Sequence, residues 1–310
     1  MITALLVLVV TAGFAAAIAA AHGGAGGGLW LGVVVLTGLS AWMVQRLAQL
    51  GGGRGWRGRV LGLLAPLGFG AVVLALWEVL VIGFQVPMVL LPAPSAIAAR
   101  MTASSGLLAQ DFVQTFVKAV LAGYVMGGAL GFGVALLADR VPFLGRGLLP
   151  VANFVSALPV IGIAPIMVMW FGFDWPSKAA VVVVMTFFPM LVNTLAGLAA
   201  AGALERDLMR SYAATHAQAL WKLRLPAALP FIFTALKVNA PLALIGAIVA
   251  EFFGSPTTGM GFRITTEASK LALDLVWAEI VVAAAAGTAF YGCVALAERA
   301  ATFWHPSMRA

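Results

Sequence analysis

The chain has 310 residues, of which 63% are hydrophobic and only 9% are charged, whereas a soluble domain carries about 25% charged residues. So few charges cannot cover a water-soluble surface, so the composition excludes that class and indicates a polytopic membrane protein. In a membrane protein the net charge of +7 reflects basic residues in the loops between spans, and these indicate the orientation of the spans. We therefore expect the lipid bilayer, and no nucleic acid, as a partner.

Eight apolar runs predict eight membrane-spanning helices, because a span needs roughly 20 apolar residues. None shows the alternation typical of a strand, and an open sheet could not satisfy its backbone in lipid, so the expected fold class is all-α. The predicted spans are 2–21, 29–50, 60–84, 112–137, 148–171, 178–201, 229–253 and 276–299.

The first 59 residues are expected to form a separate part of the chain, with two spans and a linker. The small residues at 19–21 also fit a signal-peptide cleavage site, but the basic segment that precedes such a peptide is missing. The linker, 51–59, is rich in glycine and arginine and is typical of a flexible, lipid-contacting connection. A core at 60–300 and a tail at 301–310 follow.

Lysine and arginine predict the orientation of the spans. With the N-terminus inside and eight spans, twelve basic residues fall on the cytoplasmic side and four on the outer side, as the positive-inside rule requires. Both termini are then cytoplasmic, as is the polar segment 203–228. The cytoplasmic set is Arg46, Arg54, Arg57, Arg59, Arg140, Arg146, Arg206, Arg210, Lys222, Arg224, Arg299 and Arg309, and the outer set is Arg100, Lys178, Arg263 and Lys270.

The predicted cytoplasmic loop 203–228 contains a charged, amphipathic island, 207–226, between two apolar runs. Leu208, Tyr212 and Leu220 recur at helical intervals, and Leu225-Pro226 ends the island. This pattern predicts a short helix, a bend and a second helix before the next span. Such an island either docks a cytoplasmic partner or lies on the inner leaflet as an amphipathic helix.

Motifs for catalysis, metal or nucleotide binding are missing from the sequence. Its three histidines, His22, His216 and His305, lie too far apart for a local metal site. The sequence holds neither G-x-S-x-G nor G-x-x-x-x-G-K-[ST]. We therefore expect no catalytic site, metal or cofactor in this chain, and any ATP would be bound by another chain.

The island matches the spacing of a known signature: Glu-Ala-Ala, three residues, Gly, nine residues, Ile, any residue, Leu-Pro. The corresponding residues here are Asp207-Leu208-Met209, Ala213 and Leu223-Arg224-Leu225-Pro226. In this loop the chain resembles the permeases of ABC importers. The family's glycine permits a sharp bend, and the alanine at 213 leaves the geometry of that bend open.

Further motifs across 60–300 resemble the nitrate/sulfonate/taurine branch of these permeases. Those at 207–212 and 250–254 look closer to members that move thiamine-pyrimidine precursors or riboflavin. The motifs for the branch are Leu91-Pro-Ala-Pro-Ser95, Ala157-Leu-Pro159 with Trp170-Phe-Gly172, Phe188-Pro189 to Asn193-Thr-Leu-Ala-Gly197, and Leu225-Pro-Ala-Ala-Leu-Pro230.

The resemblance implies a type I ABC-importer permease: a six-helix core, here with two additional N-terminal helices, in the bacterial cytoplasmic membrane. It implies a homodimer, two cytoplasmic ATPase subunits that bind ATP and Mg, and a solute-binding protein. An ion-coupled secondary transporter and a non-transporting membrane assembly factor are the alternatives. The implied ATPase-coupling residues are Asp207, Arg210, Ser211, Tyr212, Ala213, Ala214, His216, Trp221 and Lys222.

Prolines and polar residues within the spans are the candidates for the translocation pathway. Pro159 and Pro165 are expected to break the backbone hydrogen bonds of the span 148–171, which makes it a candidate gate. The polar residues could instead make interhelical hydrogen bonds. Gly123, Gly127 and Gly131 predict close helix packing, within or between chains. The pathway candidates are Pro159, Ile163, Pro165, Met169, Asn193, Asn239 and Glu78.

Overall fold

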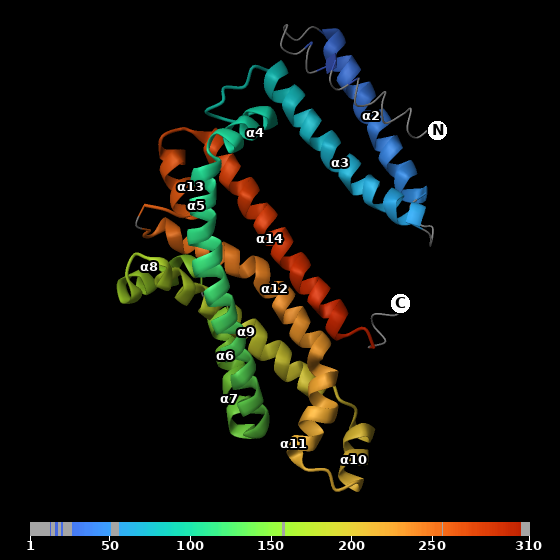
Figure 1. The fold of residues 1–310 in the computed structure, drawn as a ribbon, viewed down its shortest axis with the longest axis vertical. Helices are drawn as coiled ribbons and strands as arrows, with labels where there is room; N and C mark the ends of the chain where they lie inside the picture. The colour runs from blue at the N-terminus through green and yellow to red at the C-terminus, as the bar shows by residue number, and fades with distance from the viewer. Residues whose placement is uncertain are drawn as a thin grey trace. The chain divides into compact units, whose positions relative to one another are not determined.

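A computed structural model of the chain describes residues 27–50, 56–156, 159–255 and 257–304, with positions 13, 16, 17 and 20 (Figure 1). The described residues form helices joined by turns, and they contain no strand. The predicted all-α class is confirmed.

The chain divides into two compact units, residues 1–103 with 270–278 and residues 104–269 with 279–310. In the first unit α2 (Gly27–Leu50) packs against α3 (Trp56–Gly83), and their buried contact includes Val33, Met43 and Ala65. The short helix α4 (Pro94–Ala103) follows.

The second unit holds the remaining helices. Its long helices are joined by short connections, and one of them, α14, begins in the first unit. The elements are α5 (Ser105–Phe112), the π-helical η1 (Val113–Val120), α6 (Leu121–Arg140), α7 (Pro142–Ser156), α8 (Val160–Phe171), α9 (Trp175–Ala199), α10 (Ala203–Ser211), α11 (His216–Ala219), the π-helical η2 (Leu220–Arg224), α12 (Leu225–Phe252), α13 (Met260–Ser269) and α14 (Leu273–Ala301).

Five helical segments among the described residues are long and apolar enough to cross a membrane: Leu64–Gly83, Ser105–Arg140, Trp175–Ala199, His216–Phe252 and Leu273–Ala301. Each overlaps one predicted span. The predicted span 29–50 lies within helix α2, and most of the predicted span 2–21 lies outside the described residues.

The predicted span 148–171 is wrong as one continuous helix. Helix α7 ends at Ser156, and α8 begins at Val160 after Pro159, whose extended backbone (φ −63°, ψ 123°) caps α8. Proline has no N–H, and it biases the residue before it away from helical geometry. Pro165, by contrast, lies inside α8 without ending it. The twelve residues of α8 extend about 18 Å, too short to cross a bilayer.

Helices α6 and α9 lie in close backbone contact along the glycine stripe of α6. A Cβ atom on Gly123 would lie 2.5 Å from Val182 Cβ, one on Gly127 2.8 Å from the Val183 carbonyl oxygen, and one on Gly131 2.5 Å from the Phe187 carbonyl oxygen. The stripe therefore packs within one chain, and it does not provide the surface between chains that was its alternative role.

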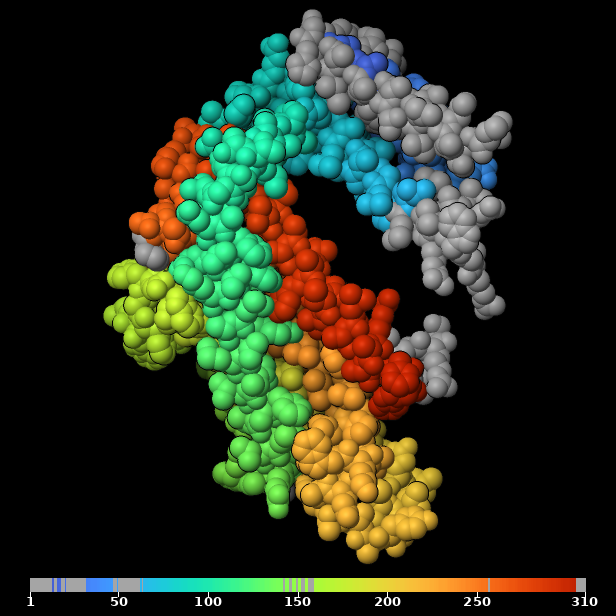
Figure 2. Space-filling view, viewed as in Figure 1, coloured from blue at the N-terminus to red at the C-terminus, as the bar shows by residue number. Residues whose placement is uncertain are grey.

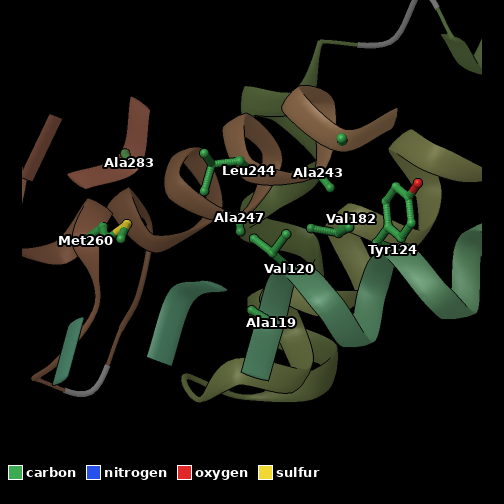
Figure 3. Close-up of a cluster of buried hydrophobic side chains, with 10 residues drawn as sticks. Ala119, Val120, Tyr124, Val182, Ala243, Leu244, Ala247, Met260 and Ala283 are labelled. Atoms are coloured by element: carbon green, nitrogen blue, oxygen red, sulfur yellow. The ribbon is translucent and has the colours of Figure 1, made fainter. Parts of the chain in front are cut away.

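Six helical elements of the second unit contribute to one apolar cluster (Figure 3). Val120, Tyr124, Val182, Leu244 and Met260 come from η1, α6, α9, α12 and α13 and are buried together. Ala283 adds a contact from α14. The Tyr124 hydroxyl donates to the Leu236 carbonyl at 2.9 Å, so the polar end of this buried side chain is satisfied.

Replacing Gly127 by alanine is expected to destabilise the protein by about 1–3 kcal/mol, because the added methyl group overpacks the contact of α6 with α9. Gly133 lies on the same helix, and a Cβ atom there would meet no atom within 4 Å. Gly133→Ala should therefore leave the thermal unfolding temperature in detergent unchanged or raise it. Equal unfolding temperatures for the two variants would contradict this account of the stripe.

Candidate functional site

The 203–228 loop is an exposed helix–turn–helix at one end of the second unit, as Figure 2 shows in gold. Helix α10 has no buried residue. It begins where the Gly202 N–H donates to the Glu205 carboxylate at 2.6 Å. The predicted helix, bend and second helix are thus present at the predicted positions.

The bend is built on Ala213, which has a left-handed backbone with φ +52°. Its N–H donates to the Arg210 carbonyl at 2.9 Å, and the Ala214 N–H donates to the Met209 carbonyl at 3.0 Å. This pair of bonds is the Schellman motif that ends helices, with the left-handed residue usually a glycine. Alanine therefore makes the bend that the glycine of the signature would make, at a cost of roughly 1–2 kcal/mol.

The second half of the loop continues into a membrane span. Thr215 caps α11: its hydroxyl accepts from the Gln218 N–H at 3.3 Å, and its own N–H donates to the Gln218 side chain at 2.8 Å. Helix α11 then runs through η2 into α12, which makes one helical segment of 37 residues from His216 to Phe252. A displacement of α11 would therefore act directly on the span.

The predicted coupling residues lie together on the surface of this loop. All are exposed except Ala214, which is half-buried. Tyr212 and Trp221 are 78% and 64% exposed, and Arg210 makes an exposed ion pair with Asp207 at 3.3 Å. The structure brings the whole predicted set to one surface.

Arg224 anchors the loop to the helical core. Its guanidinium donates two hydrogen bonds to the Asp139 carboxylate, at 2.6 and 2.7 Å, and a third to the Leu198 carbonyl at 3.1 Å. Both charged side chains are largely buried. This bidentate pair joins the ends of α6, α9 and η2. In the sequence Arg224 indicates only topology, because nothing local identifies its partner.

The predicted pathway residues belong to both units of the chain. Glu78 belongs to the first unit, where its carboxylate accepts from the Ser95 N–H and hydroxyl at 2.9 and 2.5 Å and so caps α4. The others lie in the second unit. Asn193 donates to the Pro189 carbonyl in its own helix, at 2.8 Å. The fully buried Asn239 joins α12 to α9 by donating to the Thr186 carbonyl, also at 2.8 Å.

The other pathway candidates lie on or beside α8. Pro159 caps that helix, and Ile163 and Pro165 are half-buried within it. Met169 is 83% exposed. Helix α8 therefore presents an exposed apolar face that includes Met169, and the gate remains a prediction.

A polar network at the opposite end of the unit was not predicted. Helix α13 follows α12, and the N–H groups at its start are held by side chains of other elements. Gly259 N–H donates to Asp111 at 2.6 Å, Met260 N–H to the Thr115 hydroxyl at 2.8 Å, and Gly261 N–H to Glu251 at 2.7 Å. Carboxylates at a helix N-terminus are favoured by the helix dipole.

The same network joins α5, η1 and α12. The Thr115 hydroxyl donates to Glu251 at 2.7 Å, and Arg263 pairs with the buried Asp111 at 2.8 Å. Glu251 is therefore buried and hydrogen-bonded. Elsewhere in α12, Lys237 pairs with Glu298 at 2.6 Å. A sequence signal exists: polar residues at 111, 114, 115 and 118 fall on one helical face within an apolar run.

Asp174 caps the start of α9 beside this network. The Trp175 backbone N–H donates to its carboxylate at 2.8 Å, and the Gln114 side-chain amide donates to it at 2.7 Å. These two bonds, that to the backbone first, hold the pKa of Asp174 below its ordinary value. Gln114 in turn accepts from Lys118 at 3.0 Å, so η1 is tied to the turn before α9.

Comparison with known proteins identifies the family. Residues 119–309 match the family described as the binding-protein-dependent transport system inner membrane component. The chain belongs to this family. It is therefore an ABC transporter permease, which confirms the resemblance found in the sequence, and α2 and α3 lie outside the matched region.

Three relatives are named for different solutes. The formylaminopyrimidine transport permease ThiX of Halalkalibacterium halodurans is 34% identical over 64% of this chain and 79% of its own length. The riboflavin permease RibX of Chloroflexus aurantiacus is 29% identical, over 76% and 88%. The taurine permease TauC of Escherichia coli is also 29% identical, over 76% and 87%.

Replacing Ala213 by glycine is expected to stabilise the permease by about 1 kcal/mol, because glycine adopts the left-handed backbone without steric cost. Ala217 lies in α11 and is exposed, so Ala217→Gly should destabilise by about 1 kcal/mol. Thermal unfolding in detergent measures both changes. Destabilisation by Ala213→Gly would contradict the bend described above.

Breaking the anchor of the loop should destabilise the permease strongly. Arg224→Gln leaves Asp139 without its buried partner, at a cost of about 3 kcal/mol. Arg210→Gln removes the exposed pair with Asp207 and should change stability by less than about 1 kcal/mol. Thermal unfolding of the two variants compares them directly. Similar losses would show that Arg224 does not carry the anchor.

Proposed function

We propose that this permease is the membrane subunit of an ATP-driven importer, and that its 203–228 loop docks a separate cytoplasmic ATPase that binds ATP and Mg. The observation that carries the proposal is the exposed helix–turn–helix whose second helix continues unbroken into a 37-residue segment. Binding at the loop would thereby be joined mechanically to a membrane span.

The surface of the loop suits docking into a groove of a partner protein. Its exposed apolar side chains include Leu204, Tyr212 and Trp221, and basic residues flank them at Arg206 and Lys222. An amphipathic helix with aromatic anchors is a common ligand of such grooves. The same surface could lie on a leaflet, but the Schellman bend folds it into a compact projection.

The anchor at Arg224 suggests how the motion would spread. ATP-driven closure of the ATPase would move α10 and α11 together, and η2 would carry the movement into α12. Because Arg224 binds the ends of α6 and α9 as well, these helices would move with α12. Coupling of this kind would link the ATPase-binding loop to the membrane spans through one helical segment, α11 to α12, that has two positions.

The partners and topology follow from the same proposal. Two copies of the chain would form the pathway, each with an ATPase on its loop, and the positive-inside rule would place the loop and both termini in the cytoplasm. A solute-binding protein would meet the opposite side. The named relatives support import of a small solute, either a heterocycle like those of ThiX and RibX or a compound like that of TauC.

Replacing Tyr212 by glutamate should uncouple transport, because a charge would stand where the aromatic anchor enters the partner. In liposomes containing the permease and its ATPase, hydrolysis stimulated by the loaded binding protein should fall at least tenfold. Tyr212→Phe keeps the ring and should retain most of the stimulation. Full stimulation of the glutamate variant, or uptake driven by an ion gradient without ATP, would refute the proposed function.

A further inference from the structure

A cavity of about 310 Å³ lies at the end of α12 that is farthest from the 203–228 loop. The 28 residues of α12 extend about 42 Å, which is long enough to cross the membrane. If the 203–228 loop lies in the cytoplasm, as proposed above, the cavity at the other end of α12 lies at the outer mouth of the permease. The cavity opens between the end of α12 and the side of α13. Its lining residues are Glu251, Phe252, Phe253, Gly254, Ser255, Phe262, Thr265, Thr266 and Ser269.

The lining combines aromatic walls with hydroxyl groups. Three phenylalanine rings and four hydroxyl side chains surround the space. The hydroxyls of Ser255, Thr265 and Ser269 already donate to backbone carbonyls, but each keeps acceptor capacity. The Thr266 hydroxyl makes no hydrogen bond within the described part of the chain. Such a lining suits a planar ring with polar atoms at its edge.

Glu251 is the acidic residue among those that line the cavity. Its side chain is only 3% exposed, and its two oxygens are held by the Thr115 hydroxyl and the Gly261 N–H. Each oxygen retains a further lone pair for a donor. Gly259 allows the backbone before α13 to approach the Glu251 carboxylate, because a Cβ atom at this position would lie 2.6 Å from a carboxylate oxygen. Its φ of +132° also favours glycine.

The charges around the cavity disfavour an anion. Among the described residues that line it, one is acidic and none is basic. Two basic residues at this end of the unit are engaged with other groups: Arg263 pairs with Asp111, and the Lys178 ammonium is held by the Phe173 carbonyl and the Ser177 hydroxyl. A sulfonate or carboxylate in this space would therefore find an acidic residue and no basic one among the lining side chains.

We propose that this cavity is a solute site at the outer mouth of the permease, and that it takes an uncharged, planar nitrogen heterocycle bearing N–H donors. The amino group would donate to Glu251, the ring would pack on the phenylalanines, and the hydroxyls would meet the ring nitrogens. Its volume lies at the low end for ligand sites, which suits one or two rings. This inference rests on the proposed function and narrows its solute class.

Equilibrium binding to the purified chain in lipid nanodiscs tests the site without the ATPase. The probe is 4-aminopyrimidine, and benzenesulfonate is an anionic ring of similar size. We expect saturable binding of 4-aminopyrimidine that benzenesulfonate does not displace. Thr266→Val, which removes a hydroxyl and no internal hydrogen bond, and Phe253→Leu should each weaken binding at least fivefold.

Thr234→Val is the matched control, because Thr234 lies at the other end of α12 and its hydroxyl only donates to Pro230. This variant should bind 4-aminopyrimidine as the natural chain does. Absence of saturable binding, displacement by benzenesulfonate, or unchanged binding in Thr266→Val and Phe253→Leu would each overturn the proposal. Loss of binding-protein capture in those variants, with 4-aminopyrimidine binding unchanged, would identify a docking surface instead.

The two proposals fail in different measurements. A chain that binds 4-aminopyrimidine but never stimulates an ATPase would refute the importer and leave the site intact. A chain that couples normally but binds no heterocycle would refute the site alone.

Discussion

The close approach of α6 to α9 is the contact on which the second unit depends. Helices in a membrane gain little from burying apolar surface against one another, because lipid is as apolar as their side chains, so they rely on close packing and on interhelical hydrogen bonds. Glycines at 123, 127 and 131 bring the two backbones together, and Tyr124 and Asn239 then bond to carbonyls of α12 and α9. The apolar cluster of Figure 3 is built around this arrangement.

Polar groups fasten this packed core at both ends. At one end Arg224 binds Asp139 and the end of α9. At the other, Asp111, Thr115 and Glu251 hold the start of α13. Few charges occur in this chain, and several of them are placed where helices meet, since a buried charge is tolerated when it is paired or bonded.

This distribution suits a protein that changes conformation. Between its two ends the core is held by apolar contacts, small residues and the hydrogen bonds of Tyr124 and Asn239, whereas charged side chains fasten the ends. A movement of the 203–228 loop would therefore act on α6, α9 and α12 together. The π-helical segments η1 and η2 lie beside the two fastened ends, and such segments are frequent at functional sites.

The sequence by itself determined the class, most spans and the position of the exposed loop. Hydropathy and helical periodicity belong to contiguous residues, so they could be read without knowing any partner. The spacing from Asp207 to Pro226 likewise placed the loop correctly, and it indicated the family that the comparison then showed.

The tertiary structure alone decided which residues meet. Arg224 and Asp139 are 85 positions apart, and Gly259 and Asp111 are 148 apart, so neither pair leaves a local trace. The structure also showed that the glycine stripe faces α9 and that Ala213 adopts the left-handed bend. The break at Pro159 was predicted from the sequence, whereas the structure showed that Pro165 does not end α8. The long-range pairs depend on contacts formed only when distant segments pack, whereas hydropathy and periodicity are present before the chain folds. The backbone at Ala213 is set by hydrogen bonds within a few residues, but an alanine in the sequence does not indicate a left-handed conformation.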